Sequence, residues 1–120
     1  MNLSNYQKLS APLVRIGLGL IFLANAYIAF VTPDDFTKLI GESFLATLLP
    51  VSADLFVRFI GVSDGLVALL LFIGKGQKYV AAYASLWLVG VMVTIGIKEP
   101  ADMIEHAGIL SVALYLVRYL

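Results

Sequence analysis

Asp64 is the ionisable residue that lies deepest within an apolar stretch of the sequence. It stands between Ser63 and Gly65, in the middle of the run from Leu55 to Ile73. Burying a carboxyl group in hydrocarbon costs at least about 2.5 kcal/mol unless the group is paired or hydrated. Asp64, with Ser63 beside it, therefore has two interpretations. In the functional one, it carries a proton, contacts a ligand or anchors a polar network. In the structural one, it is either ion-paired or neutral and hydrogen-bonded.

The spacing around Asp64 indicates that it faces protein. Gly61, Asp64 and Ala68 recur at i, i+3 and i+7 and share one side of a helix. Small residues let a neighbouring helix approach closely. In an earlier apolar run, Arg15 is expected either to extend to lipid headgroups or to reach inward toward Asp64 with the help of water. Asn25 is expected inside, because a buried amide needs interhelical hydrogen bonds.

A second group of polar residues lies at the starts of the second and fourth apolar runs. Arg58 and Glu105 are expected to meet as an ion pair at an outer mouth or to remain as separate solvated side chains. A stripe of polar or small positions suited to helix packing contains Glu105, Gly108, Ser111 and Tyr115. His106 points about 100° away from Glu105 on a helix. A single histidine beside a carboxylate on another face does not make a metal site, and none is expected.

Several chemistries are excluded by residue type. The chain has no cysteine, so it has no disulfide, thiolate metal site or thiol nucleophile. One histidine cannot ligate a haem from both sides, and the segment Gly74-Lys75-Gly76 is a turn and not a nucleotide cradle. Trp87 is expected to pack in a helix bundle or to face lipid. No catalytic residue and no cofactor are indicated, although a quinone is compatible with the residues present.

The composition is that of an integral membrane protein. Of the 120 residues, 61% are hydrophobic and only 13% are charged, whereas a soluble domain carries about 25% charged residues. The mean hydropathy is +0.96. The lipid bilayer is therefore the expected solvent. The eight basic and eight acidic residues cancel, which argues against binding to nucleic acid, because that requires clustered positive charge.

Four apolar runs predict an all-α fold, a bundle of four transmembrane helices in a single domain of residues 1–120. The runs are Leu13–Val31, Leu55–Ile73, Tyr79–Ile97 and Ile104–Leu120. Each is close to the length of about 20 residues that a helix needs to cross a bilayer. Lipid offers no partner to a bare backbone group, so each crossing must be a helix.

Prolines and glycines predict where these helices begin and end. Pro12, Pro33 and Pro100 each suit the first turn of a helix, where the missing N–H costs nothing. Thr32 is a candidate cap for the helix that starts at Pro33. The segment Gly74–Lys78 predicts a tight basic turn between the second and third runs.

The segment 34–50 is too polar to cross a membrane. Its apolar residues recur at helical spacing and are Phe36, Leu39, Ile40, Phe44 and Leu48. We expect an amphipathic helix that lies along the membrane interface. The alternative is an ordinary connector that folds over the bundle.

The distribution of basic residues predicts the orientation. If both termini share one side, that side holds five basic residues, Lys8, Arg15, Lys75, Lys78 and Arg118. The other side holds Lys38, Arg58 and Lys98 with seven of the eight acids. Positively charged loops stay inside, so we expect cytoplasmic termini in a prokaryotic inner membrane. The first run also mimics a cleavable signal, but Arg15 would interrupt its apolar part, and we expect a retained helix.

Two segments resemble the DoxX-like family of small four-helix membrane proteins. Such proteins typically begin the first span with Arg and an apolar run that contains Gly, as in Leu13–Phe22. Their second span carries an acid next to Gly and ends in a Gly-basic turn, as in Gly61–Gly65 and Leu71–Lys75. The family usually has Glu where this chain has Asp64, and the small residue after the polar position of the first span is less clear at Asn25-Ala26. The resemblance implies a fold found beside membrane redox systems. Some members of the family are subunits of a thiosulfate:quinone oxidoreductase, and others belong to oxidative-stress complexes. Eukaryotic relatives are assembly chaperones or cargo receptors.

Three functions are compatible with these features. The leading hypothesis is an accessory or scaffold subunit of a membrane-associated redox complex, bound to a membrane protein partner or a second copy, with Arg15, Asn25 and Asp64 holding its interior. The second is a quinone- or lipid-binding subunit of an oxidoreductase, in which Asp64 takes up protons. A small proton-coupled transporter is less favoured, because the first span contains no acid.

Overall fold

The computed structural model describes residues 3–95 and 99–119, and these residues form six helices. The helices are α1 (Leu3–Val31), α2 (Asp34–Gly41), α3 (Leu45–Leu48), α4 (Ala53–Ile73), α5 (Gln77–Ile95) and α6 (Pro100–Tyr119). The predicted all-α fold is confirmed. The expected third span ends at Ile97, and this residue and Lys98 lie outside the described residues.

Three helices are long and apolar enough to cross a membrane within the described part of the chain. They are the segments Ser10–Val31, Ala53–Ile73 and Pro100–Arg118. Many of their outward side chains are large and apolar, and Leu13 and Ile104 are each more than 70% exposed, as is Leu86 on the further helix α5. An apolar surface of this extent is typical of contact with lipid or with another protein.

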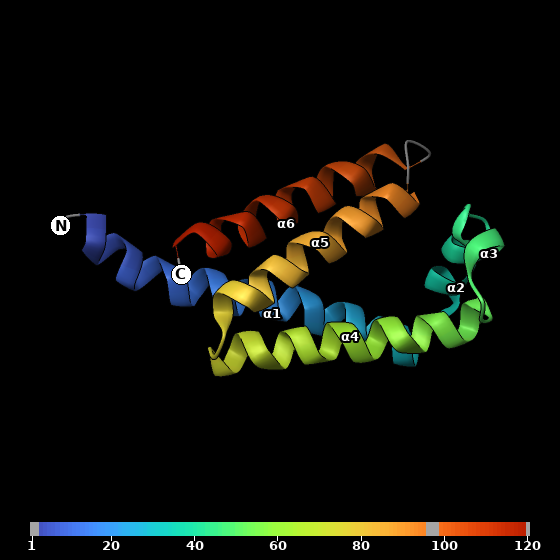
Figure 1. Cartoon of the computed structure of the whole chain (residues 1–120), viewed down its shortest axis with the longest axis horizontal. Coiled ribbons are helices and arrows are strands. Elements are labelled where there is room, and N and C mark those ends of the chain that lie inside the picture. The colour runs from blue at the N-terminus through green and yellow to red at the C-terminus, as the bar shows by residue number, and fades with distance from the viewer. Residues whose placement is uncertain (1–2, 96–98, 120) are drawn as a thin grey trace.

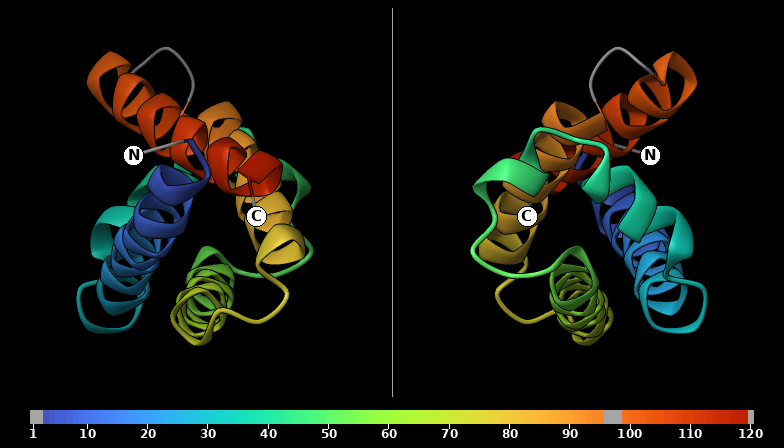
Figure 2. Two further views of the ribbon diagram at one scale, coloured as in Figure 1. Left: turned by 90° about the vertical axis from the view of Figure 1, so that its left-hand side faces the viewer. Right: turned by 90° about the vertical axis from the view of Figure 1, so that its right-hand side faces the viewer.

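The four long helices are arranged as two antiparallel pairs. Helix α1 lies along α4, and α5 lies along α6 (Figure 1). The start of α1, the end of α6 and the turn between α4 and α5 lie at one end of the molecule, and α2 and α3 lie at the other. From their common turn, α4 and α5 diverge toward the end that carries α2 and α3, as the end-on views also show (Figure 2). The hydroxyl groups of Ser10 and Tyr115 lie 3.2 Å apart and link α1 to α6.

The pairing of α1 with α4 depends on two glycines that face aromatic rings. A Cβ atom on Gly19 would lie 2.6 Å from the ring of Phe72, and a Cβ atom on Gly61 would lie 2.7 Å from the ring of Phe30. Each helix thus supplies one glycine and one ring. A side chain at either glycine would push the helices apart, because real Cβ atoms do not approach so closely.

The pairing of α5 with α6 depends on alanines. Ala81 and Ala84 on α5 and Ala113 on α6 are fully buried, together with Leu116. Small residues allow close approach of helix backbones in a membrane protein, where packing contacts replace the hydrophobic effect. The stripe that begins at Glu105 packs against a neighbouring helix only at its last position. Glu105, Gly108 and Ser111 are exposed, whereas Tyr115 is partly buried and lies against Ser10 of α1.

Two of the proline predictions were wrong. Pro12 lies inside α1, which begins ten residues before the predicted start at Leu13. Proline removes one N–H and therefore one hydrogen bond, and a long helix can continue past it. Pro33 occupies the N-cap position of α2 in a helical conformation without a side-chain cap, so Thr32 does not cap that helix. Pro100 is the first residue of α6, as predicted.

The segment between α1 and α4 is helical and amphipathic, but it is broken. Helix α2 ends at Gly41, and Ser43 bridges to α3 by donating to the Ile40 carbonyl oxygen at 2.7 Å and accepting from the Leu45 N–H at 3.2 Å. Ile40 is buried, whereas Asp34 is exposed. The segment folds over one end of the helix pairs (Figure 1), where Ile40 and Phe36 pack against the bundle. Phe44 and Leu48 are more than half exposed, so only part of the apolar face lies against the bundle, and the interfacial helix stays a prediction.

Candidate functional site

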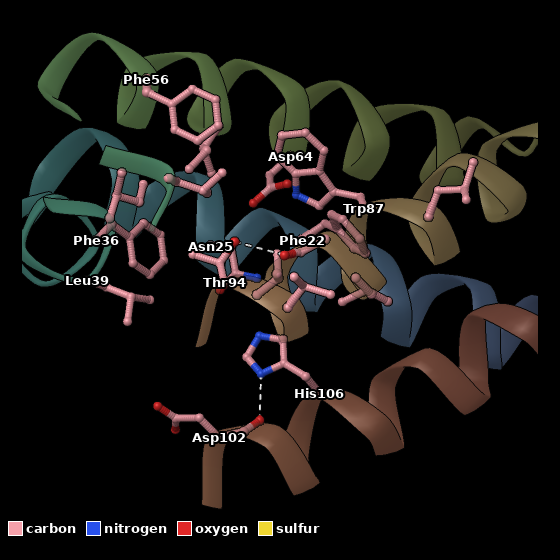
Figure 3. Close-up of a pocket in the computed structure, with 18 of the residues that line it drawn as sticks. Phe22, Asn25, Phe36, Leu39, Phe56, Asp64, Trp87, Thr94, Asp102 and His106 are labelled. Atoms are coloured by element: carbon pink, nitrogen blue, oxygen red, sulfur yellow. Dashed lines mark hydrogen bonds between the residues drawn. The ribbon is translucent and has the colours of Figure 1, made fainter. Parts of the chain in front are cut away.

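A cavity of about 690 Å³ occupies the space between the two helix pairs. Side chains of α1, α4, α5 and α6 line its walls, and those of α2 and α3 line the end that they cover. Its lining is predominantly apolar (Figure 3). The polar side chains that line it are Asn25, Asp64, Tyr83, Thr94, Asp102 and His106, together with the indole of Trp87.

The cavity exists because α4 and α5 diverge and because α5 has a glycine, Gly90, in the part that lies apart from α4. Tyr83, Trp87, Gly90 and Thr94 follow one another at spacings of three or four residues and share one face of α5. A Cβ atom on Gly90 would have no neighbour within 4 Å. Thr94 does not fill the gap, because its hydroxyl group donates back to the Gly90 carbonyl oxygen at 2.9 Å.

Asp64 lies in the wall of the cavity on α4. Its side chain is only 3% exposed, as the spacing of small residues on α4 predicts. The indole N–H of Trp87 is directed toward its carboxyl group (Figure 3). The oxygen Oδ1 is buried and has no hydrogen-bond partner among the described residues. Phe22 and Asn25 of α1 line the same cavity. A buried acceptor without a donor is the feature of this site that requires explanation.

Ser63, beside Asp64, positions the aromatic side chains. Its hydroxyl group lies 2.7 Å from that of Tyr83, so a hydrogen bond links α4 to α5. The Tyr83 ring stacks with that of Trp87 at a centroid distance of 6.0 Å and an interplanar angle of 21°. Trp87 also contacts Phe59 at 6.2 Å. The hydrogen bond and the two ring contacts together fix the indole next to the carboxyl group.

His106 lies across the cavity from Asp64 (Figure 3). Its Nδ1 atom is 2.8 Å from the Asp102 carbonyl oxygen. A carbonyl oxygen only accepts, so Nδ1 carries a proton, and Nε2 faces the cavity. His106, which the sequence placed at an outer mouth, therefore belongs to the cavity that contains Asp64.

Arg15 does not approach Asp64. Its guanidinium group lies against Gly74, which ends α4 in a left-handed conformation with φ of +82°. Gly74 is ten residues beyond Asp64 on the chain, which corresponds to about 15 Å along a helix. The positive charge therefore lies at the C-terminal end of α4, where it is favourable toward the helix dipole. The Nε atom of Arg15 is buried without a partner among the described residues.

Arg58 and Glu105 are not paired in the described structure. Arg58 lines a small cleft together with Asp54 of α4 and Thr37 of α2. Glu105 is exposed on α6. Of the predicted site residues, the cavity therefore combines Asn25, Asp64 and His106, with Ser63 as support. It leaves the arginines and Glu105 elsewhere.

The residues that sequence reasoning missed are Trp87 and Gly90. The chain has one tryptophan, and its position in the middle of an apolar run gave no sign of whether it faces lipid or an acid. Within the described residues, no group of three or more His, Asp or Glu side chains could hold a metal ion. Comparison of the chain with known protein families, with curated proteins and with solved structures gives no significant match in any of the three.

Proposed function

We propose that this protein spans the membrane four times and binds an apolar small molecule in the cavity between its helix pairs. The observation that supports the binding function is the cavity itself. It is predominantly apolar and has a few polar groups, and its volume of about 690 Å³ lies in the range of about 300–1,000 Å³ that is typical of ligand sites. A protein with a purely structural interior would not need this space, since protein interiors are close-packed.

The four-span arrangement uses α1, α4, α5 and α6. Helix α5 has 19 residues, which at a rise of 1.5 Å per residue gives about 28 Å, close to the thickness of the hydrocarbon core. The alternation of helix ends in Figure 1 suits four crossings with both termini on one side. Helix α1 has 29 residues and a length of about 44 Å, so its first turns would extend beyond the hydrocarbon on the side of the termini.

Single cysteines test the orientation without background labelling, because the chain has none of its own. In the proposed arrangement a cysteine at Lys75 reacts with a membrane-impermeant maleimide only after the cytoplasmic side is exposed. A cysteine at Glu42 reacts from the outside of intact cells. Reaction of both positions from the same side would refute four crossings.

Trp87 tests the binding function, because it is the only tryptophan and lines the cavity. The probe is 3-bromo-4-octylbenzyl alcohol, which carries its bromine close to the hydroxyl group, because bromine quenches indole fluorescence on contact. We expect quenching of the protein in lipid nanodiscs to saturate as the probe is added. The control is Trp87→Phe combined with Leu114→Trp, which moves the indole to a position that is 51% exposed on α6. Quenching that rises without saturation and equally in both proteins would refute the cavity as a binding site.

An accessory subunit of the DoxX-like type, which is the leading hypothesis from the sequence, is the second candidate here. The exposed leucines and isoleucines of α1, α5 and α6 support it, because they could contact a membrane protein partner as well as lipid. Native mass spectrometry of the protein extracted in mild detergent separates the two functions. An accessory subunit would retain a protein partner, and a binding protein would retain a small molecule.

A further inference from the structure

No lysine or arginine among the described residues accompanies the acid in the cavity. Arg15, which could have neutralised it, lies against Gly74 at the C-terminal end of α4. Besides Asp64, the titratable side chains that line the cavity are Tyr83, Asp102 and His106. His106 lies across the cavity (Figure 3), with its Nδ1 atom held by the Asp102 carbonyl oxygen. A carboxylate within a membrane requires a positive partner, and no described lysine or arginine of the lining supplies it.

The free acceptor at Asp64 defines what a ligand must offer. Oδ1 is buried without a partner, although Trp87 is directed toward the same carboxyl group. A ligand that satisfies Oδ1 must donate a hydrogen bond. A quinone carries only carbonyl acceptors, whereas an ammonium group carries up to three donors and a charge. The side-chain oxygen of Asn25, which lines the same cavity, is a second acceptor in reach of that wall.

The aromatic residues near the carboxyl group also favour a cation. The stacked rings of Tyr83 and Trp87, together with Phe22, line the part of the cavity that contains Asp64. The faces of aromatic rings attract a positive charge, most strongly at tryptophan and when water is excluded. Farther from Asp64, Phe36 and Leu39 of α2 form an apolar lining with no basic residue.

We propose that the cavity binds an apolar amine, whose ammonium group pairs with the Asp64 carboxylate while its hydrocarbon body extends toward α2. This inference rests on the proposed binding function and specifies the class of ligand for the same site. It predicts that the charge of the ligand, and not only its apolar surface, determines affinity. The contrasting possibility is that Asp64 stays neutral and that any apolar molecule of suitable size binds equally well.

The test compares two probes that differ only at one end. 3-Bromo-4-octylbenzylamine carries an ammonium group at neutral pH, and 3-bromo-4-octylbenzyl alcohol carries a hydroxyl group; in both the bromine lies close to that end, within reach of Trp87 when the end lies at Asp64. Both are titrated against the full-length protein in zwitterionic lipid nanodiscs, with Trp87 emission as the signal, and each apparent affinity is corrected for the partition of the probe into empty nanodiscs. We expect the amine to bind at least tenfold more tightly, because hydrogen bonds to charged groups are the strong ones. Equal affinities for the two probes would overturn the proposal.

Two variants at one position assign the effect to the carboxyl group. Asp64→Asn should lower amine affinity to that of the alcohol, since the amide keeps the size but loses the charge. Asp64→Glu should retain the preference for the amine, because the cavity has room beyond the carboxyl group. A loss of both probes in Asp64→Asn, with native helicity by circular dichroism, would show that Asp64 shapes the cavity and does not select charge, and this would also overturn the proposal.

The failure of this inference differs from the failure of the proposed function. If the alcohol and the amine both saturate with equal affinity, the cavity binds ligands but the amine inference is wrong. If neither probe quenches Trp87 saturably, the binding function itself is wrong. A preference for the amine that persists in Asp64→Asn would assign it to anionic or interfacial groups elsewhere and refute the role of this carboxyl group.

Discussion

Filling the cavity at Gly90 should block ligand binding without unfolding the protein. Gly90 lies on the cavity face of α5, and a Cβ atom there would meet nothing within 4 Å. Gly90→Leu therefore adds a side chain to empty space one turn from Trp87. Leucine is also a better helix former than glycine by about 0.8 kcal/mol, so we expect the free energy of unfolding to stay the same or to rise.

The expected loss of affinity follows from the ligand atoms that the leucine displaces. A leucine side chain occupies the space of about four ligand atoms, and a ligand of drug size gains about 0.3 kcal/mol per atom. The displaced contacts amount to about 1.2 kcal/mol, which corresponds to about an eightfold weaker binding of 3-bromo-4-octylbenzyl alcohol. Steric exclusion of the rest of the probe would increase this loss.

The matched control is Gly108→Leu. Gly108 is also in a helix, is exposed, and also has nothing within 4 Å of a Cβ atom, but it does not line the cavity. Both variants gain the same helix propensity, so they differ only in where the new side chain projects. The assay is the saturable quenching of Trp87, with unfolding by dodecyl sulfate followed by circular dichroism. Equal probe affinity in the two variants would refute the assignment of the cavity as the binding site.

Two further predictions concern stability. Gly74→Ala should lower the free energy of unfolding by at least about 1 kcal/mol, because φ of +82° is unfavourable for alanine and its Cβ atom would meet the Arg15 guanidinium; an unchanged unfolding midpoint in dodecyl sulfate would contradict this. Ser63→Ala and Tyr83→Phe should each cost about 0.6 kcal/mol, since they remove the same hydrogen bond between α4 and α5. The double variant should then cost clearly less than twice that amount, and full additivity would show that the two hydroxyl groups do not interact.

The helices were predictable because long apolar runs with few charged residues are typical of helices that can cross a membrane. The predicted ends at Val31 and Ile73 match those of α1 and α4, since Thr32 and Gly74 begin segments that a helix does not continue. The start of α1 was not predictable from Pro12. Proline is favoured in the first turn of a helix, but it can also lie inside a longer helix, as Pro12 does. The division of segment 34–50 into α2 and α3 depends on hydrogen bonds of Ser43, which a period of 3.6 residues does not reveal.

The sequence predicted one residue of the candidate site but not the set of residues that surround it. The burial of Asp64 follows from its position in an apolar run, because a carboxyl group exposed to lipid would be too costly. Its surroundings do not follow, since Trp87 and His106 reach the cavity only through the crossing of two helix pairs. No local pattern in the sequence distinguishes Gly90, which opens space, from Gly61, which receives the ring of Phe30.

The arrangement of small residues explains why the opening lies where it does. Gly19 and Gly61 allow α1 to approach α4, and Ala81 and Ala113 do the same for α5 and α6. The two pairs also pack on each other, in a core that includes Leu18, Leu71 and Leu116, and the space between them opens only toward α2 and α3. Asp64 lies at this opening, and its carboxyl group is therefore buried by the protein yet adjoins the cavity. Because Arg15 lies at the other side of that core, against Gly74, the proposed ligand would supply the charge that matches the carboxylate.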